Sequence, residues 1–238
     1  MRPVLLIAGR ECAAFFRTSA GWVTIALYTL LSGLWIALST LRPGEPATLR
    51  AFFGVSHWIL LFVAPAISMR LIAEEKRSGT MEVLMTSPIS DWQMVLGKYL
   101  GAVGFFLLML SPSLVYVGLL EALADPEYGP IATGYAGVIL VGMLYLSAGL
   151  FTSALTENQV VSLLSTIFFF VLLELGVTQG ARLAGPPFDR AIYGFSVLLR
   201  AGDFAKGIID TGHVVALLAG SAWFIVLSVA VVESRRWR

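Results

Sequence analysis

The chain has 238 residues, of which 58% are hydrophobic and only 13% are charged. Soluble domains usually carry about a quarter charged residues, so this composition disfavours a water-soluble protein. The formal net charge of +1 gives no basic surface that could follow a nucleic acid. The single cysteine, Cys12, excludes a disulfide within the chain.

The first 18 residues predict an amphipathic helix at the membrane interface. At about 100° per residue, Arg2, Arg10 and Arg17 fall on one face of such a helix. The opposite face is apolar and contains Val4, Leu5, Ala8, Cys12, Phe15 and Phe16. A basic stripe opposite an apolar stripe is typical of a helix that lies among lipid headgroups. A frayed tail is the alternative.

Six apolar runs are long enough to cross a bilayer, for which a helix needs roughly 20 residues. Their centres contain no Lys, Arg or Asp, because burying such charges in hydrocarbon is costly. We therefore predict an all-α integral membrane protein with a single transmembrane domain over residues 1–238. The interfacial helix of residues 1–18 precedes six membrane-spanning helices near residues 22–40, 52–71, 96–120, 134–155, 160–177 and 214–232.

A dense charge cluster, Glu74 to Arg77, marks the point where the second span leaves the membrane. Gly79 then permits a sharp turn, and Thr80 can cap a short helix from Met81 to Thr86. Ser90 to Gln93 matches a capping box that starts the third span. We expect a short helix across the membrane surface, through which a soluble partner could move two spans together.

An even number of spans places both termini on one side of the membrane. Ten Lys and Arg residues belong to the N-terminal segment, the coupling segment 74–92 with its flanks and the C-terminal tail, against six in the other connections. The positive-inside rule then predicts that both termini and segment 74–92 are cytoplasmic. The connection from Glu121 to Glu127 has no basic residue and suits an outer loop. Ser196 to His213 predicts a short helix on the outer surface.

One carboxylate, Glu174, lies clearly within a predicted span. It is either a substrate or proton contact that faces the bundle interior, or a side chain that snorkels to the outer interface; the sequence leaves both open. Pro65 and Pro112 also lie within spans and should kink or locally open them. We group these three residues as a possible substrate path.

Catalytic motifs are absent from the sequence. The Gly97-Lys98 pair is followed by Tyr99 and lacks the spacing of a phosphate loop. His57 and His213 should both lie near the outer membrane face, and two histidines without a third ligand indicate interfacial residues rather than a metal site. We therefore expect no enzyme activity, no metal and no cofactor in this chain.

Several segments resemble the ABC-2 type permeases, which are the membrane subunits of ABC exporters. The similarity is greatest to the small six-span subgroup that includes bacterial gliding-motility permeases. The segments that carry it are Arg70-Leu71-Ile72-Ala73-Glu74-Glu75, Ser78-Gly79-Thr80-Met81-Glu82-Val83-Leu84, Thr86-Ser87-Pro88, Gly97-Lys98 and Thr156-Glu157-Asn158-Gln159.

The resemblance implies a permease of the bacterial cytoplasmic membrane that pairs with a second permease subunit and binds two separate ATPase subunits. Those ATPases would bind ATP and Mg²⁺ and drive export by alternating access. The interfacial helix and the transverse helix would contact them. The implied contact residues are Arg10, Glu11, Glu74, Glu75, Arg77, Gly79, Thr80, Glu82 and Leu84.

Two other functions are compatible with the sequence. One is an ion-coupled secondary transporter or channel that uses Glu174. The other is a membrane anchor that transports nothing and holds an ATPase with a mechanical or regulatory role.

Overall fold

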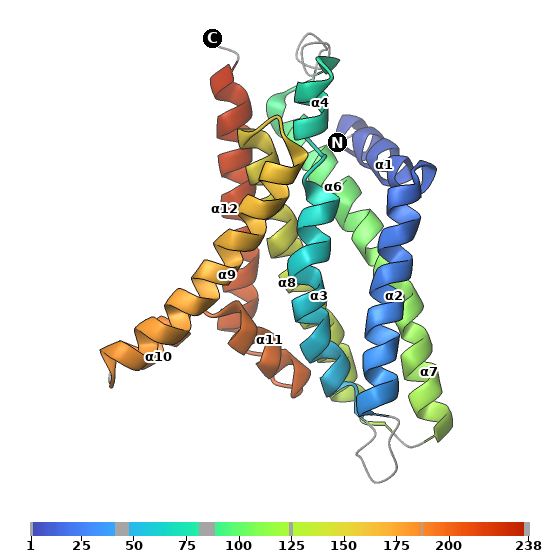
Figure 1. Cartoon of the computed structure of the whole chain (residues 1–238), viewed down its shortest axis with the longest axis vertical. Helices are drawn as coiled ribbons and strands as arrows, with labels where there is room; N and C mark the ends of the chain where they lie inside the picture. Colours follow the sequence, from blue (N-terminus) through green and yellow to red (C-terminus); the bar gives the residue numbers. More distant parts are fainter. Residues whose placement is uncertain (1, 41–47, 81–88, 124–125, 187, 236–238) are drawn as a thin grey trace.

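The computed structural model describes residues 2–40, 48–80, 89–123, 126–186 and 188–235. Every regular element within these residues is a helix (Figure 1). The elements are α1 (Arg2–Arg17), α2 (Ser19–Ser39), α3 (Arg50–Ser68), α4 (Ala73–Arg77), α6 (Asp91–Leu110), η1 (Ser111–Ser113), α7 (Leu114–Leu123), α8 (Tyr128–Leu155), α9 (Gln159–Ala184), α10 (Phe188–Tyr193), α11 (Val197–Ala205) and α12 (Thr211–Arg235).

Six helical stretches of the described chain are long and apolar enough to cross a membrane, and each overlaps one predicted span. They are Ser19–Ser39, Arg50–Arg77, Asp91–Leu123, Tyr128–Leu155, Gln159–Ala184 and Thr211–Ser234. The prediction of an all-α, multi-pass membrane protein is therefore confirmed.

Helices α3 and α8 form the centre of the bundle. In the most apolar 18-residue stretch of each of these two spans, 67% of the residues are buried inside the chain, against 22% in the spans of α2, α9 and α12. Both chain ends and α4 lie at the same end of the bundle, which we call the termini end (Figure 1). Helix α2 runs beside α7, and the Tyr116 hydroxyl of α7 donates to the carbonyl of Thr29 in α2 at 2.8 Å.

Small residues allow the central helices to approach closely. A methyl group on Gly149 of α8 would lie 1.9 Å from Oγ of Ser68 and 3.6 Å from Cα of Pro65, so α3 and α8 touch along this line. Pro65 is buried within α3 and faces α8. Pro112 lies in η1, the short 3₁₀ turn that separates α6 from α7, so the third span is interrupted at the predicted proline.

The connection after α9 differs from the sequence expectation. Helix α9 continues to Ala184, seven residues beyond the predicted limit of 177. The short helix expected after it is α11, which exposes Leu199 and packs its other face against α8 and α3, where Phe204 is 1% exposed and sits over Gly137. Burial of Val197, Phe204 and Ala205 on one face explains why a short polar-leaning segment returns into the bundle.

Candidate functional site

Helix α1 packs along the first turns of α6 at the termini end. A methyl group on Gly97 would lie 2.7 Å from Cβ of Ile7, and one on Gly101 would lie 2.6 Å from Cβ of Glu11. Glycines four residues apart on one helix thus provide the groove that α1 occupies. The contact face includes Ile7 rather than Leu5, which the sequence had placed on the apolar face and which is 67% exposed.

A buried lysine joins three helices beside this groove. Nζ of Lys98, on α6, lies 3.1 Å from Oε1 of Glu11 on α1 and 2.6 Å from Oε1 of Glu75 on α4. The Lys98 side chain is 1% exposed, and each glutamate side chain is 16% exposed. We call Glu11, Glu75 and Lys98 the ionic triad.

The triad carries one positive and two negative formal charges. A lysine buried this deeply needs a paired carboxylate, because its desolvation is otherwise uncompensated. The second oxygen of Glu75 is buried and has no hydrogen-bond partner among the described residues. The arrangement therefore holds α1, α4 and α6 together.

A cavity beside the ionic triad has a volume of about 230 Å³ and opens at the termini end. Arg70 lines this cavity together with the ionic triad. Its guanidinium lies 4.0 Å above the Phe15 ring, and Nη1 donates to Oγ1 of Thr18 at 3.3 Å. Cation–π contact with Phe15 fixes the position of Arg70 against α1. The lining is completed by Glu11, Ala14, Leu71, Glu74, Glu75 and Lys98.

The turn between α3 and α4 is fixed to the end of α8. Oγ of Ser153 accepts hydrogen bonds from the backbone N–H groups of Ile72 (3.1 Å) and Ala73 (2.9 Å) and donates to the carbonyl of Met69 (2.8 Å). The ammonium group of Lys76 also donates to the carbonyl of Ala154. A displacement of α4 must therefore move α8 as well as α3.

Gly79 ends α4 in the left-handed conformation, with φ of +73°, which favours glycine at the predicted turn. Glu74, Arg77, Gly79 and Thr80 are exposed around this turn. The predicted transverse helix, with Glu82 and Leu84, lies outside the described residues.

The capping box at the start of α6 is confirmed, since Oγ of Ser90 accepts from the Gln93 N–H and Oε1 of Gln93 accepts from the Ser90 N–H.

Residues 38–187, more than half of the sequence, match the family model described as "ABC-2 family transporter protein". The chain belongs to the ABC-2 transporter family. The predicted resemblance is confirmed at the level of the family.

Two curated relatives show the same similarity over a shorter region. The "probable multidrug ABC transporter permease YbhR" of Escherichia coli K12 is 25% identical to this ABC-2 family protein over 100 residues, and so is its counterpart from Escherichia coli O157:H7. The alignment covers 42% of this chain and 27% of the length of each relative.

The structure of this ABC-2 family protein brings together the predicted contact residues of α1 with those of α4. Arg10 is exposed and lies 3.4 Å from Glu11, next to the ionic triad. Within the described part, Glu74, Arg77, Gly79 and Thr80 face outward, whereas the carboxylates of Glu11 and Glu75 turn toward Lys98. The predicted residues thus divide into an exposed set and an internal pair.

Lys98 was not among the predicted site residues. The sequence does contain a signal for it, because a lysine inside an apolar helix must either snorkel to the interface or pair with a carboxylate. Placing the start of the third span near residue 96 made Lys98 look like a residue at the membrane surface. The observed span begins at Asp91, so Lys98 lies within it.

Glu174 makes a contact that neither sequence alternative described. Its Oε1 accepts the backbone N–H groups of Val197 (2.7 Å) and Leu198 (2.8 Å), and its Oε2 accepts the Ser196 hydroxyl at 2.9 Å. A carboxylate at the first turn of a helix satisfies N–H groups that have no intrahelical partner and interacts favourably with the helix dipole. Glu174 therefore fixes the start of α11 to α9.

The two histidines have different surroundings. His57 is packed inside the bundle: its side chain is 3% exposed, and Nε2 lies 3.3 Å from the hydroxyl of Tyr145. His213 lies near the start of α12, with ring nitrogens 3.9 Å from carboxylate oxygens of Asp203 and Asp210. The two histidines thus occupy separate environments.

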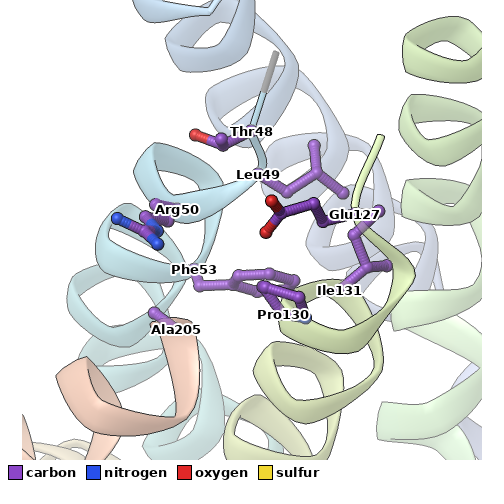
Figure 2. A pocket seen from close by; sticks show the side chains of 8 residues that line it. All are labelled: Thr48, Leu49, Arg50, Phe53, Glu127, Pro130, Ile131 and Ala205. Carbon is purple, nitrogen blue, oxygen red and sulfur yellow. The ribbon is translucent and has the colours of Figure 1, made fainter. Parts of the chain in front are cut away.

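A second cavity, of about 180 Å³, opens at the end opposite the termini (Figure 2). Arg50 and Glu127 stand on opposite sides of it, and Phe53 and Pro130 form its floor. Leu49 and Ile131 lie along the apolar remainder of the wall. This cavity is separate from the ionic triad, which lies at the termini end.

Proposed function

We propose that this chain is the permease subunit of an ATP-driven exporter and receives the motion of its ATPase through α4, α1 and the segment between α4 and α6. The observation that carries the proposal is the ionic triad. Lys98 joins α1 and α4 to the membrane-spanning helix α6, at the end where the exposed Glu74, Arg77 and Thr80 gather. Membership of the ABC-2 family supports an ATPase as the partner.

The anchoring contacts support a lever. A force on the exposed residues reaches α3 through the covalent chain, α8 through Ser153, and α1 and α6 through Lys98. Packed helices move as units rather than deform continuously, so a small push at α4 can shift several spans together. Such a shift is what alternating access requires.

The exposed and the internal residues have different roles in this proposal. Arg10, Glu74, Arg77, Gly79 and Thr80 meet the ATPase directly, together with Glu82 and Leu84. Glu11 and Glu75 act as positioning residues that hold α1 and α4 on α6. ATP and Mg²⁺ bind in the ATPase subunits. Two ATPase subunits serve a pair of permease subunits in the cytoplasmic membrane.

Photo-crosslinking in the native host tests the contact. A benzophenone amino acid at Arg77 is expected to capture an ABC ATPase, identified by mass spectrometry of the crosslinked band. The matched control is the same amino acid at Glu121, which is exposed near the end of α7 at the opposite end of the bundle. Capture of the ATPase from neither position, or equally from both, contradicts the proposal.

The orientation has its own test. Both termini are expected on the cytoplasmic side, because the positively charged connections lie at the termini end. Phosphatase and fluorescent-protein fusions at Asp125 and near Arg190 should report an external location, and fusions at Arg238 an internal one. An external signal from Arg238 would reverse the orientation and place the ionic triad outside the cell.

A further inference from the structure

An aromatic groove lies between α8, α9, α11 and α12, in the half of the bundle away from the termini. Its volume is about 240 Å³. Phe169 and Phe170 of α9, Phe224 and Leu217 of α12, and Phe195 line it, and Arg200 is its only charged lining residue among those described. We call this the aromatic groove.

The groove is large enough for part of a hydrocarbon chain. A buried cavity of about 150 Å³ lined by Leu, Ile and Phe stays dry and binds benzene. The aromatic groove is larger and has the same kind of lining. Water gains few hydrogen bonds on such a surface, so an apolar occupant is favoured.

Arg200 gives the groove a polar end. Its Nε and Nη2 both donate to the carbonyl of Gly194, which fixes the guanidinium in place. Burial lowers the pKa of Arg200, while Asp210 opposes that change; an arginine nevertheless stays charged. A guanidinium has five N–H donors, and the bonds to Gly194 use two of them. The remaining donors suit a phosphate oxygen.

We propose that the aromatic groove binds a phospholipid with an anionic headgroup, with one acyl chain against the phenylalanines and its phosphate on Arg200. The groove lies along membrane-spanning helices, so a lipid can enter it from the bilayer. The single cation at one end of an apolar groove matches an acidic amphiphile rather than a neutral one. This site does not depend on the ATPase contact, and its failure would leave the proposed function unchanged.

Brominated lipids provide the test, because bromine quenches tryptophan fluorescence on contact. The full-length Phe224→Trp chain, purified in detergent, is titrated with brominated phosphatidylglycerol or brominated phosphatidylcholine, and the signal of the chain without this reporter is subtracted. Both lipids carry a phosphate, but the quaternary ammonium of phosphatidylcholine cancels its charge. We therefore expect phosphatidylglycerol, which is a net anion, to quench at about tenfold lower concentration, a ratio equivalent to about 1.4 kcal/mol. Phe169→Trp is a second reporter that guards against a local effect of the first.

Two variants separate the outcomes. Arg200→Gln should remove the preference for phosphatidylglycerol but keep quenching, whereas Arg182→Gln, an exposed cation of the last turn of α9 outside the groove lining, should keep both. Equal quenching by both lipids in the reporter chain that keeps Arg200 overturns the proposal. A preference for phosphatidylglycerol that survives Arg200→Gln overturns it as well. If neither lipid quenches while inorganic phosphate alone changes the reporter's fluorescence, the site binds phosphate without an acyl chain, and this would also overturn the proposal.

Discussion

Replacing Lys98 by methionine is expected to release α1 from α6 and to destabilise the protein. The change leaves Glu11 and Glu75 facing each other without the cation that both contact. Breaking a buried ion pair by removing one partner costs about 3–5 kcal/mol, because the remaining charge is uncompensated. The slight exposure of both glutamates places the expected loss near the lower end of that range.

Cys12 provides a direct measurement of this release. It is the only cysteine, it lies on the face of α1 that packs near Gly104, and burial raises the pKa of its thiol. Both effects slow alkylation while α1 is in place, since the thiolate is the reactive form. Maleimide should therefore label the Lys98→Met variant markedly faster than the unaltered chain, and its melting temperature in detergent should fall.

Lys206→Met is the matched control for this experiment. Lys206 pairs with Asp203 at an exposed position, where an ion pair contributes less than about 1 kcal/mol, so labelling and melting should hardly change. A triple variant, Lys98→Met with Glu11→Gln and Glu75→Gln, should recover part of the stability, because it leaves no unpaired charge. If Lys98→Met labels and melts like the unaltered chain, the triad does not hold α1.

Replacing Glu174 by alanine is expected to detach α11 from α9. The variant loses all three hydrogen bonds that the carboxylate accepts from Ser196, Val197 and Leu198. Hydrogen bonds to a charged group contribute about 1.5–3 kcal/mol, and two backbone N–H groups at the start of α11 would be left without an acceptor. Melting temperature should fall, and trypsin should cut after Lys206 more rapidly in nanodiscs.

The glutamine variant distinguishes a positioning role from proton coupling. Glu174→Gln keeps an acceptor oxygen at nearly the same place but loses the charge, so its stability should lie between those of the alanine variant and the unaltered chain. Transport by Glu174→Gln should keep its pH dependence if Glu174 only positions α11. Glu121→Ala, at the exposed end of α7, should leave stability and proteolysis unchanged. A shifted pH profile in Glu174→Gln with unchanged stability would assign the residue to proton coupling instead.

The sequence by itself determined the membrane class and the helices. Long apolar runs must form helices in a bilayer, because every backbone N–H and C=O needs a partner within its own segment, and the six predicted spans follow from that requirement. Local signals were equally decisive. The capping box of Ser90 and Gln93, the left-handed Gly79 and the break at Pro112 each depend on neighbours along the chain, and each is observed as predicted.

Only the tertiary structure decided how charged side chains are used. Residues 11, 75 and 98 are far apart in sequence, and their meeting depends on the glycine groove that brings α1 onto α6. The contact of Glu174 with the start of α11 likewise required the segment after α9 to fold back into the bundle. A charged side chain in an apolar helix needs a partner of opposite charge or a hydrogen-bonding group. Which residue becomes that partner depends on which element packs against the helix, and this packing is a property of the whole bundle.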